Sequence, residues 1–227
     1  MIKHHPKFEL LQSFVKGDLP ASLSAGIAIH ADMCSVCQQK IAQLTDQIAE
    51  VSFDEAFLDR FIVDDKALDN IDAIDFDEMI EGITQSNEIE FHQTKVKKSI
   101  TFKETVYTLP TILNNMSLGK TAQIGKLART RVQLEENEIH TSLLHIEPGG
   151  GVPEHTHKGF ELTVLLEGSF RDEKGEYVKG DFIMLDGSVI HQPFSTNGCL
   201  CYTVANDALH FTQGINKLLN PIGSFIY

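Results

Sequence analysis

Residues 149–168 read GGGVPEHTHKGFELTVLLEG, and this stretch decides the fold of the C-terminal half of the chain. His155 and His157 are two residues apart, so on a β-strand their imidazoles share one face. Glu161 follows four residues later with the same parity. His191 comes after further turn signals, so it can reach the same interior from a neighbouring strand. Three imidazoles and one carboxylate on one face suit a Zn, Mn, Fe, Ni or Cu ion.

The sequence around this stretch consists of short strand-like runs separated by turns. Apolar and β-branched residues dominate at 162–166, 182–185 and 199–204, with Gly-containing turns between them. Short strands with this spacing are typical of an antiparallel sandwich or barrel. We therefore expect an all-β domain over residues 101–227, preceded by a linker at 86–100.

The N-terminal part has a helical pattern instead. From Leu23 to Ile48, apolar residues recur every three or four positions, which predicts one helical stripe. The stripe also carries His30, Cys34 and Cys37 within about two turns. Two thiols and an imidazole on one face are soft ligands that suit zinc, and a closed structural zinc site needs a fourth ligand.

The fourth ligand can come from His4 or His5, if a helix predicted over residues 8–16 packs against the stripe. The alternative without a metal is that the two cysteines are ordinary small core residues. A redox role for the C-x2-C pair is disfavoured, because no βαβ pattern surrounds it. The added imidazole on the same face favours zinc.

The negative charge of the chain is concentrated in one segment. The whole chain has 19 Lys and Arg against 32 Asp and Glu, a net charge of -13. Residues 46–90 hold fifteen of these acids and two of the bases, which accounts for the entire excess. Within them Phe53, Phe57 and Phe61 recur every four residues, a spacing that favours an amphipathic helix. Such a helix is either a solvated face or a docking surface for a basic protein.

The acidic balance also limits the classes of partner. Nucleic acid and anionic membranes attract positive surfaces, so we expect neither as a direct partner. No apolar run reaches the roughly 18 residues that span a bilayer, and the first residues, MIKHHP, lack the pattern of a signal peptide. A cytoplasmic location is therefore expected, where cysteines are thiols or metal ligands.

The stretch quoted first resembles the first motif of the cupin superfamily, with the spacing G-x5-H-x-H-x3-E-x6-G. Residues 180–191 resemble the second cupin motif and place His191 at its histidine position. The resemblance implies a double-stranded β-helix, or jelly-roll barrel. Together with KHH at residues 3–5 and the H-x3-C-x2-C motif, it makes the chain similar to the ChrR-type zinc-dependent anti-sigma factors.

This resemblance covers nearly the whole chain and implies an α+β protein of two domains: a zinc-stabilised helical bundle at 1–85 and a cupin barrel at 101–227. It implies a structural zinc in the first domain and a second metal, zinc in the relatives, in the cupin domain. The implied ligands are His5, His30, Cys34, Cys37, His155, His157, Glu161 and His191.

The resemblance also implies a function. Its members hold a sigma factor of the extracytoplasmic-function group in a complex that cannot join RNA polymerase. The N-terminal zinc domain inhibits, and the cupin domain is needed for the response to singlet oxygen or related oxidants. Cys199 and Cys201 face the same way on a predicted strand, either as an oxidisable pair or, as we prefer, as ordinary strand packing.

Two other functions are open to the same sequence. A three-His, one-Glu cupin can be a dioxygenase, isomerase or decarboxylase in which the metal activates oxygen or polarises a carbonyl. Against an enzyme, the sequence offers no candidate base or substrate-binding Arg beside the ligands. The other alternative is a structural interaction module without a sensing role.

Overall fold

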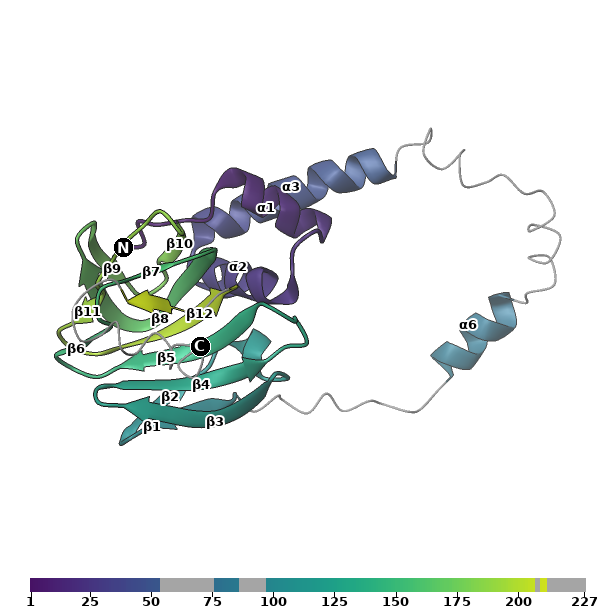
Figure 1. The fold of residues 1–227 in the computed structure, drawn as a ribbon. Helices are drawn as coiled ribbons and strands as arrows, with labels where there is room; N and C mark the ends of the chain where they lie inside the picture. Colours follow the sequence, from purple (N-terminus) through teal and green to yellow (C-terminus); the bar gives the residue numbers. More distant parts are fainter. Residues whose placement is uncertain (54–75, 86–96, 207–208, 212–227) are drawn as a thin grey trace. The chain divides into compact units, whose positions relative to one another are not determined.

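A computed structural model describes four parts of the chain, residues 1–53, 76–85, 97–206 and 209–211. Its contacts divide the chain into two compact units (Figure 1). One unit joins residues 1–43 to residues 97–227, and the other comprises residues 44–96. No helix in the described ranges is both long and apolar enough to cross a membrane.

The N-terminal helices follow the predicted pattern with one correction. The helices in the described residues are α1 (Phe8–Lys16), α2 (Ala21–Met33), α3 (Ser35–Ser52) and α6 (Phe76–Thr84). The prediction of a helix over residues 8–16 is confirmed. The single stripe expected from Leu23 to Ile48 is wrong, because Cys34 adopts an extended conformation (φ -122°, ψ 99°) and separates α2 from α3. The apolar spacing continues across this break, so periodicity alone does not reveal it.

The C-terminal part is a set of antiparallel strands. They are β1 (Ser99–Phe102), β2 (Thr105–Thr108), β3 (Ser117–Ile124), β4 (Leu127–Gln133), β5 (His140–Ile146), β6 (Gly150–Gly151), β7 (His155–His157), β8 (Phe160–Asp172), β9 (Gly175–Val178), β10 (Phe182–Asp186), β11 (Phe194–Ser195), β12 (Cys199–Ala205) and β13 (Leu209–Phe211). A short 3-10 helix, Thr111–Leu113, follows β2. The predicted strands and turns of this region are confirmed.

The central sheet has the order β3-β4-β5-β12-β8-β11-β6, and β9 and β10 also pair with β8. The sheet curls into a half-barrel (Figure 1), while β7 pairs with β13 and β1 pairs with β2. An α+β architecture with N-terminal helices and a C-terminal cupin-like barrel is therefore confirmed.

Helix α2 packs directly on the outer face of β8 and β12. A Cβ atom added to Gly26 would lie 2.6 Å from Leu162 Cδ2, so only glycine fits there without a shift. The Tyr202 hydroxyl donates a hydrogen bond to the Ser22 carbonyl oxygen over 2.9 Å. With α2 outside and the barrel interior inside, β8 is buried on both faces from 161 to 166, which explains why apolar and β-branched residues dominate there apart from Glu161.

This packing explains why the contact grouping does not follow the boundaries expected from the sequence, 1–85, 86–100 and 101–227. Residues 1–43 lie on the cupin sheet instead of forming a body of their own. Of the acidic segment, residues 46–53 and 76–85 are described; Phe57 and Phe61 lie outside the described residues. Phe53 belongs to the described part and is exposed.

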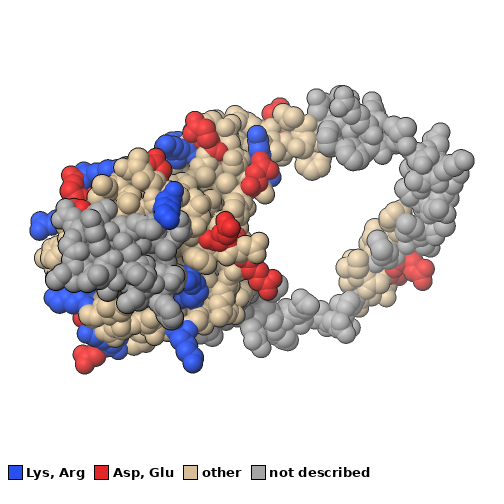
Figure 2. Space-filling model, in the orientation of Figure 1, with Lys and Arg blue, Asp and Glu red and all other residues tan. Residues whose placement is uncertain are grey.

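Helix α6 has an amphipathic sequence whose apolar side chains face solvent. Phe76, Ile80 and Ile83 follow the i, i+4, i+7 spacing and are about half exposed or more. Asp77, Glu78 and Glu81 alternate with them. On the face of the molecule drawn in Figure 2, acidic and basic side chains of the first unit are interspersed.

Candidate metal centres

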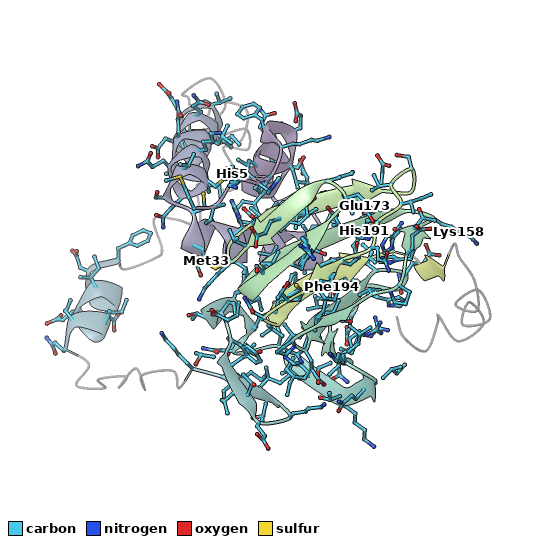
Figure 3. The ribbon with its side chains drawn as sticks, turned by 90° about the vertical axis from the view of Figure 1, so that its left-hand side faces the viewer. His5, Met33, Lys158, Glu173, His191 and Phe194 are labelled. Carbon is cyan, nitrogen blue, oxygen red and sulfur yellow. The ribbon has the colours of Figure 1, made fainter. Side chains whose placement is uncertain are left out.

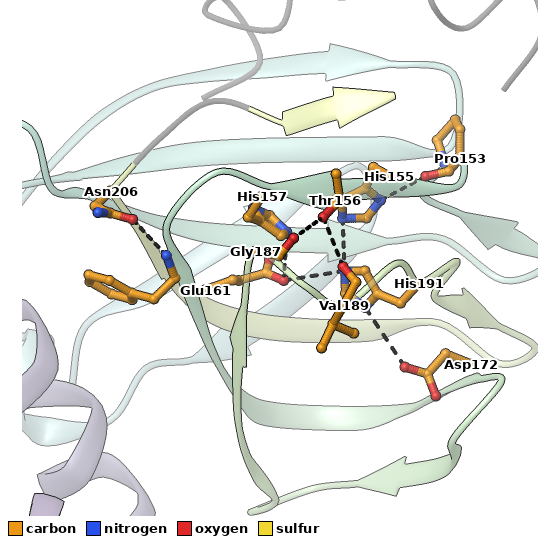
Figure 4. A network of polar contacts seen from close by, with 11 residues as sticks. Pro153, His155, Thr156, His157, Glu161, Asp172, Gly187, Val189, His191 and Asn206 are labelled. Carbon is orange, nitrogen blue, oxygen red and sulfur yellow. Dashed lines mark hydrogen bonds and ion pairs between the residues drawn. The ribbon is translucent and has the colours of Figure 1, made fainter. Parts of the chain in front are cut away.

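The structure brings His155, His157, Glu161 and His191 together inside the half-barrel. Their ligand atoms all lie within 4.8 Å of one another, and all four residues are buried. His155 and His157 lie on β7, and Glu161 lies on β8. His191 follows β10 and is held by a reciprocal pair of 3.1 Å backbone hydrogen bonds with His155. The four residues lie side by side (Figure 4), although His191 lies between β10 and β11 and not, as the sequence suggests, on a strand.

The ring of His155 is oriented so that its unprotonated nitrogen faces the cluster. His155 Nδ1 lies 2.7 Å from the Pro153 carbonyl oxygen, which can only accept, so Nδ1 carries the proton. His155 Nε2 then faces His191 Nε2 at 2.9 Å. Burial, the largest influence, lowers the pKa of His155 to about 4, so this imidazole is neutral at pH 7. Two nitrogens on one ion, each bound at about 2.1 Å, would lie about 3.0 Å apart at a right angle and about 3.4 Å apart at a tetrahedral angle.

Glu161 supplies the negative charge of this cluster. Its Oε2 lies 3.0 Å from His157 Nε2 and 3.4 Å from His191 Nε2. Burial alone would raise the pKa of Glu161, but hydrogen bonds from His157 and His191 outweigh it and hold the pKa well below its usual value. A buried carboxylate beside three imidazoles is a suitable ligand set for a divalent ion.

A second acid, Asp172, supports the cluster from behind. Its Oδ2 lies 3.8 Å from His191 Nδ1, the ring nitrogen that faces away from the cluster (Figure 4). Carboxylates at this position orient metal-ligating histidines in many proteins. The sequence pointed to Asp172 only as a turn residue, because its partner is far away along the chain.

An apolar cavity of about 280 Å³ adjoins the cluster. His155, Glu161 and His191 form part of its wall, and most of the remaining wall is aliphatic or aromatic. Representative lining residues are Leu127, Leu144, Ile146, Val152 and Phe170. A metal ion held here would border a space that admits a small molecule, which distinguishes this cluster from a closed structural site.

The thiols flagged in the sequence, Cys199 and Cys201, are both buried in the barrel core. Cys201 also lines the cavity. A hydrogen bond from Cys201 lowers the pKa of Cys199, and the same bond, with burial, raises that of Cys201 well above its usual value. The pair is thus in contact on one strand face, as the sequence predicted.

The second cluster joins His5, His30, Cys34 and Cys37, and it lies beside the helices, away from the labelled His191 (Figure 3). His5 Nδ1 is 3.4 Å from Cys34 Sγ and 3.5 Å from Cys37 Sγ. A nitrogen and a sulfur bound to one tetrahedral zinc ion lie about 3.6 Å apart. The extended conformation of Cys34, which ends α2, accompanies this approach. The sequence left His4 and His5 as alternatives, and here His5 is the one beside the sulfurs.

His30 is oriented toward this cluster by a backbone carbonyl. Its Nδ1 donates to the Gly180 carbonyl oxygen over 2.7 Å, so Nε2 bears a lone pair. Nε2 is fully buried and has no hydrogen-bond partner among the described residues. Burial lowers the pKa of His30, and burial together with Cys34 raises that of Cys37 to about 11. An unpaired buried nitrogen beside two thiols fits a metal ion, which would convert the thiols to thiolates.

The two clusters offer different chemistry. Two sulfurs and two nitrogens suit a closed tetrahedral zinc site that stabilises structure. Three nitrogens and a carboxylate beside a cavity suit an ion that keeps positions open. His140 and His145, which the sequence did not assign to a site, belong to neither cluster.

Comparison with known proteins agrees with this arrangement. Residues 120–208 match the family model of the ChrR cupin-like domain. The chain is 23% identical to the anti-sigma-E factor ChrR of Cereibacter sphaeroides over 97% of both chains. A solved structure described as Rhodobacter sphaeroides SigE in complex with the anti-sigma ChrR matches with a TM-score of 0.65 at 21% identity. The match covers 90% of this chain and 100% of that one.

An RmlC-like cupin protein from Ralstonia eutropha JMP134 matches less closely, with 17% identity and a TM-score of 0.38 over 44% of this chain and 69% of that one. The family resemblance seen in the sequence is confirmed by the matches to ChrR. Residues 120–208 thus match the ChrR cupin-like domain, within a chain that is similar to ChrR along nearly its whole length.

Proposed function

We propose that this chain is an anti-sigma factor that binds an extracytoplasmic-function sigma factor and keeps it from RNA polymerase. The observation that carries the proposal is the combination, in one chain, of the His/Cys cluster on the N-terminal helices with a ChrR-type cupin domain. The similarity to ChrR over 97% of the chain supports it, because the relative with a solved structure is in complex with SigE.

Residues 1–85 are the proposed sigma-binding part, with 86–100 as the connection and 101–227 as the sensory part. Sigma factors present basic surfaces for DNA, and residues 46–90 hold the acidic excess of this chain. Charge of this sign would speed the encounter, while exposed apolar side chains would hold the complex. On α6, Phe76, Ile80 and Ile83 are exposed and available for such contacts.

A binding experiment with the full chain tests this proposal. Extracytoplasmic-function sigma factors from the same organism are each mixed with it, and complex formation and transcription by the RNA polymerase holoenzyme are measured. We expect a stable complex and loss of sigma-dependent transcription. Full transcription at saturating amounts of the chain would refute the proposal.

Both clusters are proposed to hold zinc. His5, His30, Cys34 and Cys37 would hold a structural ion that fixes residues 1–6 against α2 and α3. His155, His157, Glu161 and His191 would hold a second ion in the cupin domain. Zinc supplies a redox-inert Lewis acid, so any oxidation would occur on the ligands, on nearby thiols or on a molecule in the cavity.

The cupin domain is proposed to report oxidative stress, with singlet oxygen or related oxidants as the signal. The cavity beside the cluster and the adjacent Cys201 support this role, because both place oxidisable or ligand-binding groups at the metal centre. The cytoplasm, where sigma factors act, is the proposed location. We expect a cupin-site variant such as Glu161→Gln to bind the sigma factor normally but to lose the response to oxidant.

An oxygen-dependent enzyme is the second candidate function, favoured by the cavity next to an open ligand set. Metal analysis separates the two candidates. Zinc in both clusters agrees with the regulator, because zinc does not activate oxygen. Iron or manganese in the cupin cluster, together with oxygen uptake, would favour the enzyme.

A further inference from the structure

The N-terminal metal cluster depends on residues of the cupin domain that are not themselves ligands. His5 is carried by an N-terminal segment that contains neither helix nor strand before Phe8. Something outside that segment must therefore fix its backbone. Three consecutive cupin residues, Gly180, Asp181 and Phe182, make the contacts that do so.

Asp181 is the centre of these contacts. Its side chain is completely buried, and its Oδ1 accepts hydrogen bonds from the backbone N–H groups of Lys3, at 2.7 Å, and His4, at 3.0 Å. Its Oδ2 accepts a 2.8 Å hydrogen bond from the N–H of Val178, the last residue of β9. Hydrogen bonds to a charged carboxylate are shorter and stronger than neutral ones. One buried acid thus joins residues that are 178 positions apart in the sequence.

The neighbours of Asp181 reinforce the same attachment. The N–H of Phe182 donates to the His4 carbonyl oxygen over 3.0 Å, so both the N–H and the carbonyl group of His4 are hydrogen-bonded to this turn region. The Gly180 carbonyl orients His30, the second ligand. Gly180 has a positive φ of 91°, and a Cβ there would lie 2.5 Å from Ile2 Cδ1. Both ligand-bearing segments therefore rest on one turn between β9 and β10.

The side chain of His4 has a partner of its own in the cupin domain. Its ring packs against Tyr177 with a centroid separation of 4.8 Å. This contact turns His4 toward the barrel, while the next residue, His5, faces the two sulfurs. The arrangement gives the adjacent histidines separate roles.

We propose that Asp181 is a positioning residue for the N-terminal metal site, which holds the backbone of Lys3 and His4 so that His5 reaches the metal. The inference rests on the proposed metal binding by this cluster. It adds that the affinity of the first metal site is set partly by the second domain. Residues that orient a ligand typically contribute 10- to 100-fold to metal affinity, and we expect Asp181→Ala to weaken binding by about that factor.

Cobalt(II) titration of the metal-free full chain measures this effect. The thiolate-to-cobalt charge-transfer band reports only the N-terminal cluster, because the cupin cluster contains no thiol ligand. We expect half-saturation of Asp181→Ala at about 10- to 100-fold higher free cobalt than for the unsubstituted chain. Glu167→Gln is the matched control: Glu167 is an exposed acid that pairs with Lys179, next to the same turn, and should leave the affinity unchanged.

A double-substitution cycle distinguishes positioning of His5 from general damage to the fold. In a His5→Ala background, Asp181→Ala should change the cobalt affinity by less than about threefold, because the ligand it positions is gone. The same large loss in both backgrounds would overturn the proposal. Wild-type affinity of Asp181→Ala in the otherwise unsubstituted chain would overturn it as well.

A second variant avoids disturbing the barrel. Lys3→Pro removes one amide donor to Asp181 and leaves the turn intact, and we expect about tenfold weaker cobalt binding. Unchanged affinity would contradict the proposal even if Asp181→Ala does not fold. If the unsubstituted chain gives no charge-transfer band, the metal site itself is refuted and the role of Asp181 falls with it.

Discussion

The two candidate metal clusters of this chain are built in opposite ways. The cupin cluster gathers its ligands from strands of one half-barrel and borders a cavity. The His/Cys cluster gathers its ligands from an irregular N-terminal segment and the ends of two helices, and it needs the cupin turn at 180–182 for support. The difference teaches that a rigid sheet can present a site for a ligand. The His/Cys site instead links the N-terminal segment to the two helices and so stabilises the fold.

The largest effect expected from this comparison follows removal of the thiols. Cys34→Ser/Cys37→Ser should lower the zinc content from about two ions per chain to about one, because each cluster is proposed to hold one ion. Structural zinc contributes on the order of 10 kcal/mol to folding in small peptides, so α2 and α3 should lose their cooperative thermal unfolding. Metal analysis and circular dichroism during heating measure both changes.

Cys199→Ser/Cys201→Ser is the matched control for that experiment, since it also removes two buried thiols. It should retain both zinc ions. If this variant lost zinc and the first did not, Cys199 and Cys201 would be the zinc ligands, and Cys34 and Cys37 would not. If the control variant also responds normally to oxidant, the barrel thiols have no part in sensing.

A smaller and more local effect is expected from the cupin cluster. Glu161→Gln removes the only carboxylate among its four ligands and should release the cupin ion while the N-terminal ion stays bound. The substitution also leaves three imidazoles in place, so the fold should remain. We predict a zinc content near one ion per chain. Sigma binding should stay intact, and the oxidant response should be absent. Loss of sigma binding would show that the two clusters do not have separate roles.

A still smaller effect, on stability alone, is expected from the packing of α2 on the barrel. Gly26→Ala places a methyl group 2.6 Å from Leu162 Cδ2 and should destabilise the first unit by about 1–3 kcal/mol. Gly82→Ala in α6 is the control, because no atom lies within 4 Å of the added methyl group. It should be neutral or stabilising by up to about 1 kcal/mol. Equal denaturant midpoints for both variants would mean that α2 is not closely packed on β8.

The smallest expected effect is a pH dependence at the outer face of the sheet. His145 stacks on Phe102 of β1 at 5.0 Å, faces Tyr107, Lys103 and Glu147, and has a pKa lowered mainly by burial. The folded state therefore binds fewer protons there than the unfolded state. This contribution to stability is complete above pH 6.5, the ordinary value, and is lost as the pH falls through it.

His145→Phe removes that titration and keeps an aromatic ring against Phe102. The decrease in melting temperature between about pH 7.5 and about pH 5.5 should be smaller in the variant than in the unsubstituted chain, by at most about 3 °C. An unchanged decrease would show that His145 is protonated as easily in the folded chain as in the unfolded one.

The sequence predicted residues that share a local pattern or a known motif, and it missed contacts that have neither signal. His155, His157 and Glu161 lie within seven positions, and strand alternation is enough to bring them to one face. The attachment of Lys3 to Asp181 spans 178 positions and leaves no periodic pattern, so Asp181 was recognised only as part of a turn. The grouping of residues 1–43 with the barrel was missed for the same reason.

The break between α2 and α3 illustrates a second limit. A helical spacing of apolar residues continues through Cys34, although its backbone is extended. What interrupts the helix is the approach of two thiols to His5, a tertiary contact with no counterpart in the local pattern. Tertiary contacts of this kind override local propensity wherever a site is assembled from separate segments.

Competition for the sigma factor tests the central proposal most directly. The full chain, loaded with zinc or stripped of it, is titrated into an extracytoplasmic-function sigma factor from the same organism in the presence of core RNA polymerase, and holoenzyme formation is measured. The zinc-loaded chain should prevent holoenzyme formation at stoichiometric amounts, and the stripped chain should prevent it much less. Undiminished holoenzyme formation with the zinc-loaded chain would contradict the proposed function.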